Sequence, residues 1–351
     1  MEPASPDLPL RLYEPRPQVR LHETAVPRSC VPCIDAHNHL GRWLARDWMT
    51  SDVGALISLM DACNVATVVN LDGRWGDELE ANLDRYDRAH PGRFLTFCHL
   101  DWTVLTTGET PAALDAQLRD AARRGARGLK VWKDLGLGVR DVRGNLVLPD
   151  DPRLSDAFAA AGVLGLPVLM HTADPVAFFA PVDRYNERLE ELAVHPDWWF
   201  GGESMPALSR LLDAFEAVVA THPDTTFIGA HVGNCAEDLV WVARLLDGYP
   251  NLAIDIAARL GELGRQPRAT RRLIVGHPDR VLFGTDCFPP SVADYALHFR
   301  FLESDDEHFD YAPGARVPPQ GRWRISAIDL PRDVLEQVYA GNARRLLRIT
   351  E

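Results

Sequence analysis

The most informative segment of the chain reads Cys33-Ile34-Asp35-Ala36-His37-Asn38-His39-Leu40. Its apolar start predicts a buried β-strand, and its end carries two histidines separated by one residue. Side chains two positions apart in a strand point to the same face. His37 and His39 are therefore expected to leave one face together, which suits two imidazoles that bind one cation. The alternative is a pair of histidines on an edge strand that points at water. Further candidate ligands at the ends of other strands would favour the metal site over this alternative.

The same order of short apolar run, polar loop and helical pattern repeats along the chain. The predicted strands are 31–39, 66–71, 94–101, 128–132, 167–172, 226–232, 252–256 and 281–285. Strands that alternate with helices pair in parallel through right-handed crossovers, and eight such units favour an α/β fold of the closed (β/α)₈ TIM-barrel type. No Gly-x-Gly-x-x-Gly follows the first strand, which argues against an open dinucleotide-binding sheet.

One domain accounts for most of the chain. We predict an irregular N-terminal arm over residues 1–30 and a single barrel over residues 31–351. Two connections, after the fifth and eighth strands, are unusually long: residues 173–205 and 287–331. Both follow carboxyl ends of strands, where barrel enzymes carry their chemistry. They are expected either to act as lids or to cover the barrel mouth and contribute to a homo-oligomer, most simply a dimer.

Charge and composition exclude several classes of protein. The net charge of −13 argues against nucleic-acid binding, which requires a basic surface. No apolar run approaches the roughly 20 residues of a membrane helix, and residues 1–28 lack the apolar core of a signal peptide. The six cysteines are scattered, and the pair Cys30 and Cys33 leads into a strand rather than opening a helix. Scattered free thiols fit the reducing cytoplasm.

Polar residues close four of the predicted strands. His37 and His39 end the first strand, and the fifth, sixth and eighth end in His171, His231 and Asp286. The parallel strands of a barrel bring these ends to one mouth. Imidazole and carboxylate ligands there suit Zn²⁺, or Mn²⁺ as the alternative, with a position left for water. A single strand-end histidine is more often a structural residue, and the prediction therefore depends on the set.

This set resembles the amidohydrolase superfamily. The closing segment Tyr339-Ala340-Gly341-Asn342-Ala343-Arg344-Arg345-Leu346 is similar to that of its amidohydrolase 2 branch, which contains the aminocarboxymuconate-semialdehyde decarboxylase-like proteins. The resemblance spans about residues 31–348 and implies a distorted (β/α)₈ barrel. It implies that His37, His39, His171 and Asp286 bind one divalent metal. His231 would polarise or deprotonate the water, and Asp286 is the alternative base.

Other polar residues near strand ends are candidates for contact with substrate. Lys130 and Trp132 share one face of the fourth strand. The resemblance offers Lys130 as a carboxylated lysine that bridges two metals, and the alternatives are an ion pair or a substrate contact. Arg42, Arg74 and Arg259 follow the first, second and seventh strands. Arginine suits carboxylate recognition, so several at one mouth indicate an anionic substrate, although surface ion pairs are the commoner use of each.

These observations predict a metal-dependent enzyme that acts on a small organic molecule. The first expectation is hydrolysis of an amide, lactone or ester of an anionic substrate by water activated on the metal. The alternative is a lyase that decarboxylates an aromatic or unsaturated carboxylic acid without oxidation. A barrel that has lost catalysis and only binds ligands is the third possibility.

Overall fold

The computed structural model describes residues 8–9, 12–13, 15, 18–107 and 112–349. This part of the chain contains eight strands, all paired in parallel. They are β1 (Cys33–Asn38), β2 (Val65–Asn70), β3 (Phe94–Thr96), β4 (Leu129–Val131), β5 (Val168–Met170), β6 (Phe227–Gly229), β7 (Leu252–Asp255) and β8 (Val281–Leu282). Each lies at a predicted strand. All eight end before the predicted last residue.

The strands form two sheets, β1-β2-β3 and β4-β5-β6-β7-β8. At one junction the Cys98 amide donates to Gly128, and the Lys130 amide donates to Cys98 at 2.7 Å. At the other junction the Ala36 amide donates to Phe283, and the Asp286 amide donates to His37, both at 2.9 Å. Backbone hydrogen bonds therefore continue from each sheet to the other at both ends.

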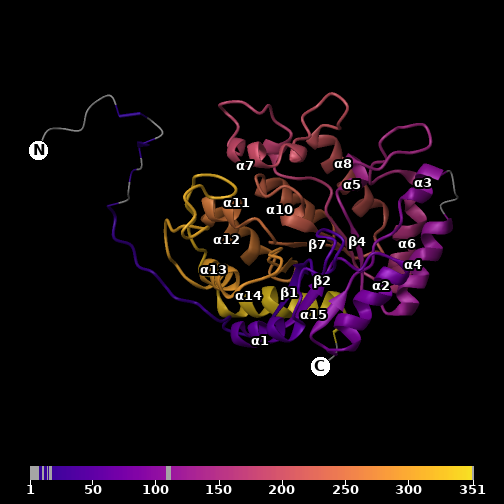
Figure 1. The fold of residues 1–351 in the computed structure, drawn as a ribbon, viewed down its shortest axis with the longest axis horizontal. Coiled ribbons are helices and arrows are strands. Elements are labelled where there is room, and N and C mark those ends of the chain that lie inside the picture. Colours follow the sequence, from indigo (N-terminus) through magenta and orange to yellow (C-terminus); the bar gives the residue numbers. More distant parts are fainter. Residues whose placement is uncertain (1–7, 10–11, 14, 16–17, 108–111, 350–351) are drawn as a thin grey trace, which may run out of the picture.

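Helices lie around the strands (Figure 1). The longer ones are α1 (Val53–Cys63), α2 (Gly76–Leu83), α4 (Ala112–Arg124), α6 (Ser155–Leu164), α8 (Leu208–Thr221), α10 (Leu239–Gly248), α12 (Pro267–Gly276) and α13 (Val292–Glu303). The shorter ones are α3 (Thr103–Thr107), α5 (Asp134–Leu137), α7 (Leu189–Val194), α9 (Ala230–Gly233), α11 (Leu260–Arg265), α14 (Arg332–Glu336) and α15 (Asn342–Leu346). Short 3₁₀ or π segments cover Asp84–Arg88, Pro152–Leu154, Val176–Phe178, Pro196–Trp198 and Gln337–Gly341. Among the described residues no helix is both long and apolar enough to cross a lipid bilayer.

Local sequence explains where several helices begin and end. Asp52 starts α1 by accepting a hydrogen bond from the Ala55 amide at 3.0 Å, and Asn64 ends it with a φ of 66°. Ser291 and Asp294 form a capping box at the start of α13. This helix lies within the second long connection, which is therefore partly helical.

The N-terminal arm contacts the body through its last residues. The Thr24 amide and hydroxyl both donate to Asp306 at 2.7 Å, and the Cys30 amide donates to Glu303. The described residues before this point extend away from the body (Figure 1).

An apolar core lies on the inward faces of the strands. Side chains from seven strands or their ends pack with the C-terminal helix in one buried cluster: Ile34, Ala36, Val69, Leu71, Leu95, Phe97, Leu169, Ile228, Ala230, Ala253, Leu282, Ala343 and Leu347. On β4, Leu129 and Val131 belong instead to the core between strands and helices, so Lys130 between them faces inward. The interior below the strand ends is therefore a packed core, as in a TIM barrel.

Substitution of Phe283 probes the packing next to the junction between β8 and β1. The buried Phe283 ring lies 5.7 Å from Phe299 and 5.2 Å from Tyr339, between centroids. Replacing Phe283 with alanine leaves a cavity and should lower the free energy of unfolding by about 3–5 kcal/mol, measured by denaturant titration. The matched control is Val240→Ala, because Val240 is 83% exposed. A loss of similar size in both variants would contradict this account.

Candidate metal centre

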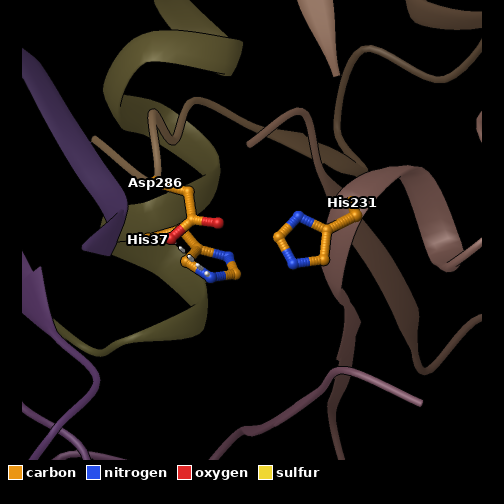
Figure 2. A group of neighbouring side chains, drawn as sticks. All are labelled: His37, His231 and Asp286. Atoms are coloured by element: carbon orange, nitrogen blue, oxygen red, sulfur yellow. Dashed lines mark ion pairs between the residues drawn. The ribbon is translucent and has the colours of Figure 1, made fainter. Parts of the chain in front are cut away.

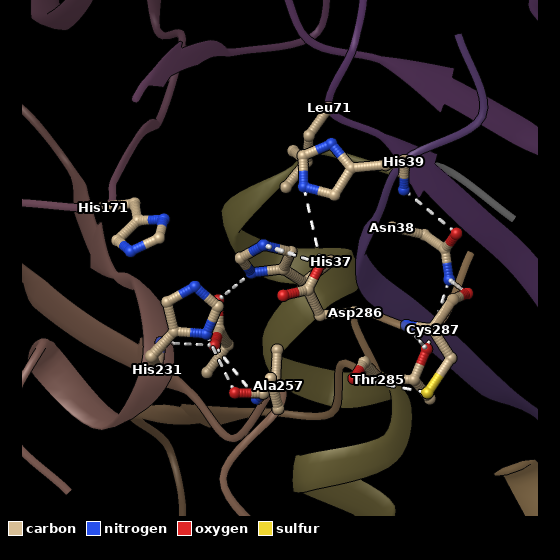
Figure 3. A network of polar contacts seen from close by, with 12 residues as sticks. His37, Asn38, His39, Leu71, His171, His231, Ala257, Thr285, Asp286 and Cys287 are labelled. Atoms are coloured by element: carbon tan, nitrogen blue, oxygen red, sulfur yellow. Dashed lines mark hydrogen bonds and ion pairs between the residues drawn. The ribbon is translucent and has the colours of Figure 1, made fainter. Parts of the chain in front are cut away.

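The five predicted site residues meet at the carboxyl ends of the strands (Figure 3). His37 lies in β1 and His39 follows that strand directly, while His171, His231 and Asp286 lie beyond β5, β6 and β8. His231 and Asp286 have left-handed backbones, with φ of 56° and 57°. Such conformations cost an L-residue about 1–3 kcal/mol and cluster at functional sites. The two strained turns thus aim polar side chains across the strand ends.

Four of these side chains carry a buried atom that has no hydrogen-bond partner among the described residues. The atoms are His37 Nε2, His39 Nε2, His171 Nδ1 and Asp286 Oδ1. Asp286 Oδ1 lies 3.8 Å from His37 Nε2 and 3.4 Å from His39 Nε2. Buried polar atoms are nearly always satisfied, so unsatisfied nitrogen and oxygen atoms at neighbouring strand ends fit ligands of a divalent transition metal. These are the four residues predicted as ligands, and that role stays a prediction.

Two buried carboxylates orient the first pair of imidazoles. His37 Nδ1 lies 2.8 Å from Asp255 Oδ2, and His39 Nδ1 lies 2.6 Å from Asp72 Oδ1. An ionised carboxylate only accepts hydrogen bonds, so each Nδ1 carries the hydrogen and each Nε2 is left with a free lone pair. Carboxylate–histidine pairs of this kind orient metal ligands and raise their basicity.

His231 faces the same space from the opposite side (Figure 2). Its Nδ1 donates to the Ala257 carbonyl at 2.9 Å, and its backbone amide donates to Asp255 Oδ1 at 2.8 Å. Its Nε2 therefore also has a free lone pair. One donor atom each from His37, His231 and Asp286 lie within 4.8 Å of one another. The arrangement lets His231 act either as a further ligand or as the proton acceptor that the sequence predicts.

Burial keeps the imidazoles of His37, His171 and His231 neutral. It lowers the pKa of His37 and of His231 well below the ordinary value, and nearby cationic groups add to the effect. Burial likewise lowers the pKa of His171 to about 3. The neutral imidazole is the form that binds a metal or accepts a proton.

The third imidazole is held by a charged pair. His171 Nε2 lies 3.2 Å from Asp174 Oδ1, and the other oxygen of Asp174 lies 2.5 Å from Lys133 Nζ. Burial alone would raise the pKa of Asp174, but Lys133 and His171 hold it below its ordinary value. Asp174 is therefore ionised and fixes the ring of His171.

Lys130 lies in the interior close to the donor atoms. Its Nζ is buried, has no partner among the described residues, and lies 5.4 Å from the centroid of the Trp132 ring. Burial lowers its pKa to about 8. Among the described residues Lys130 therefore forms no ion pair, and the roles of metal bridge and substrate contact stay predictions.

A pocket of about 830 Å³ opens above the donor atoms. His171, His231 and Asp286 line it, together with the aromatic side chains Trp132, Phe178, Trp198, Phe200 and Phe288. Most of the latter come from the two long connections after β5 and β8. Planar walls beside a metal-binding group suit a planar substrate.

Three cationic side chains also reach this pocket: Lys133, Arg188 and Arg259. The first is paired with Asp174, and the second is paired with Glu191 and Glu262. Arg259 is buried, and its one described hydrogen bond goes to the Ala258 carbonyl at 3.0 Å. Among the described residues it has no carboxylate partner, so it remains available for an anionic ligand.

The other predicted substrate contacts divide between two places. Trp132 lies at the wall of the pocket, and Arg74 lines a neighbouring cavity that Trp132 also lines. Arg42 was expected at the site, but its half-exposed side chain binds Glu78 at 2.8–3.0 Å instead. Its position directly after the turn from β1 turns it away from the mouth, where it forms a surface ion pair.

A family comparison agrees with this geometry. A sequence model of the amidohydrolase family matches residues 34–349. The chain belongs to the amidohydrolase family. Members of this family depend on a divalent metal, and the donor atoms of His37, His231 and Asp286 lie close enough together to hold one. No curated protein sequence matches the chain significantly.

Solved structures of low identity share the fold of this amidohydrolase. The 2,6-dihydroxybenzoate decarboxylase from Rhizobium is 16% identical with a TM-score of 0.58, covering 91% of this chain and 99% of that one. A dihydroxybenzoic acid decarboxylase from Polaromonas, with bound manganese and the inhibitor 2-nitroresorcinol, is 13% identical with a TM-score of 0.57, covering 92% and 98%. The 5-carboxyvanillate decarboxylase from Sphingomonas paucimobilis is 15% identical with a TM-score of 0.54, covering 91% and 100%.

Several residues of the centre were missed from the sequence. Asp255 is the inward carboxylate at the end of β7, and its place in an apolar strand was the one available signal. Asp174 and Arg188 lie in the irregular connection after β5, where no periodic pattern shows which side chains turn inward.

Proposed function

We propose that this protein is a metal-dependent, non-oxidative decarboxylase of an aromatic carboxylic acid, and that its eight strands close into one barrel. One observation supports the proposal most strongly. The buried, unsatisfied atoms of the predicted metal ligands lie beside a pocket with aromatic walls, and Arg259 in that pocket has no carboxylate partner among the described residues. The decarboxylases among its structural neighbours support it. A small-molecule substrate and a homodimer in the cytoplasm remain part of the proposal.

The substrate is held by the walls of the pocket. Trp132 and Phe288 lie with their rings edge-to-face against the His39 ring, at 5.4 and 5.2 Å, so a planar ring that enters between them reaches the metal ligands. Arg259 binds the leaving carboxylate in the orientation that precedes bond cleavage. The apolar walls exclude water from the carbon that receives a proton.

When bound by His37, His39, His171 and Asp286, the divalent metal supplies a Lewis acid that polarises substrate oxygens. His231 moves the proton. Its free Nε2 lone pair accepts the proton of a substrate hydroxyl and returns it to the ring carbon. The bond from that carbon to the carboxylate then breaks, its electron pair stays on the ring, and carbon dioxide leaves.

Product analysis tests the proposal. The purified protein, loaded with Mn²⁺ or Zn²⁺, is incubated with 2,6-dihydroxybenzoate, 5-carboxyvanillate and related hydroxybenzoates, and in parallel with lactones and amides. We expect one carbon dioxide for each aromatic acid consumed, loss of this activity on chelation, and recovery on metal addition. Acid release from a lactone or amide without carbon dioxide would instead identify the hydrolase that the sequence first predicted. A chain that refuses both metals would identify a binding protein.

A further inference from the structure

A second cavity of about 390 Å³ adjoins the metal pocket. The two share the side chains of Trp132 and Asp134. The Trp132 ring lies 5.3 Å from that of His171 and 5.2 Å from that of Trp43, between centroids. Trp132 lines both cavities and therefore lies where they meet.

Arg74 is the distinctive residue of the second cavity. Its guanidinium carbon lies 4.1 Å from the ring centroid of Trp75 and 4.5 Å from that of Trp43. Its backbone is left-handed, with a φ of 57°, which is a strained conformation for arginine. Both rings lie within cation–π distance of the guanidinium, whose N–H groups donate in its own plane, along its edge.

The partner of that edge is a neutral imidazole rather than a carboxylate. His99 Nε2 donates to the Leu71 carbonyl at 2.6 Å, so His99 Nδ1 is the acceptor for Arg74 Nη1 at 3.2 Å. Burial lowers the pKa of His99 to about 3, and the ring therefore stays neutral. Among the described residues Arg74 forms no ion pair, although Asp101 and Asp134 also line the cavity. Asp101 Oδ1 is already occupied by the Thr103 amide and hydroxyl, at 3.1 and 2.7 Å.

We propose that Arg74 binds a second carboxylate of the substrate, remote from the carboxylate that is lost at the metal centre. The guanidinium is fixed by two tryptophans and one histidine, and its remaining N–H groups form the planar fork that matches a carboxylate. A substrate that passes Trp132 fills both cavities. This inference rests on the proposed function and narrows its substrate class to aromatic dicarboxylic acids with an extended second arm.

Equilibrium binding tests this assignment without turnover. Isothermal titration calorimetry of the Zn²⁺-loaded protein compares benzoate with terephthalate, 4-carboxyphenylacetate and 4-carboxycinnamate. We expect at least one diacid to bind about 10- to 100-fold more tightly than benzoate. Arg74→Gln should abolish that advantage and leave the benzoate Kd unchanged. Arg74→Lys keeps the charge without the fork and should retain part of the advantage.

Arg140→Gln is the matched control, because Arg140 lines the same cavity but donates to the Gly144 carbonyl. It should leave every Kd unchanged. The proposal is overturned if no diacid binds more tightly than benzoate, or if Arg74→Gln weakens benzoate and the diacids equally. Carbon dioxide release from monocarboxylates alone, without any diacid preference, would remove this inference and keep the proposed function. A diacid preference that depends on Arg74, without carbon dioxide release from any substrate, would keep the carboxylate site at Arg74 and remove the proposed function.

Discussion

Replacing Asp286 with alanine should remove both metal binding and turnover. Asp286 is the one carboxylate among the predicted ligands, and its Oδ1 lies 3.4–3.8 Å from two imidazole nitrogens. Without it, three neutral imidazoles would have to hold a divalent cation with no compensating charge. We expect metal content, measured by elemental analysis, to fall below about one-tenth per chain, and turnover to fall by at least about 10³-fold, since metal polarisation contributes several kcal/mol.

Backbone strain at Asp286 requires a second variant. The φ of 57° is tolerated better by asparagine than by alanine, so Asp286→Asn separates loss of charge from loss of fold. Asp247→Ala is the matched control, because the Asp247 side chain is 76% exposed and pairs with His277 at 3.0 Å. Full metal occupancy in both Asp286 variants would show that the proposed ligand set is wrong.

The sequence predicts the strands and the ends that carry His37, His171 and Asp286, because both signals are local. A short apolar run indicates a buried strand, and the polar residue that follows it indicates where the strand ends. The parallel topology then brings these ends together at one face of the fold. The prediction for Arg42 fails for the complementary reason. It used position after a strand, whereas the direction of a side chain beyond the ladder depends on the turn and on partners such as Glu78, 36 residues away.

The residues that orient the predicted metal ligands cannot be identified from local sequence patterns. Asp72 orients His39 across 33 residues of sequence, which no local pattern around either residue indicates. The pairing of His171 with Asp174 and Lys133 joins β5 to the turn after β4. Arg74 was expected at the same mouth as the metal ligands, but it lines a neighbouring cavity and not the metal pocket. Each of these arrangements is a property of packing between segments, which no periodicity encodes.

Asp255→Asn should weaken metal binding by about 10- to 100-fold, the usual effect of losing a group that orients a ligand. Asp255 accepts hydrogen bonds from His37 Nδ1 at 2.8 Å and from the His231 amide at 2.8 Å, and both of its oxygens are used. An asparagine amide offers one oxygen and one NH₂ group, so its NH₂ group must face one of these N–H groups, where two donors meet without an acceptor. If the NH₂ meets His37 Nδ1, the imidazole hydrogen moves to Nε2, the atom that faces the metal.

Competition with a chelator of known affinity measures this effect. Asp72→Asn is the matched variant, because Asp72 makes the corresponding bond to His39 Nδ1 at 2.6 Å. Both variants should recover turnover as free metal is raised, since the ligands themselves remain, whereas Asp286→Ala should not. If Asp255→Asn lowers the melting temperature but leaves metal affinity and the metal dependence of turnover unchanged, then Asp255 serves the fold alone. The orientation of His37 would then have to come from the packing of its ring against His231, 4.8 Å away between centroids.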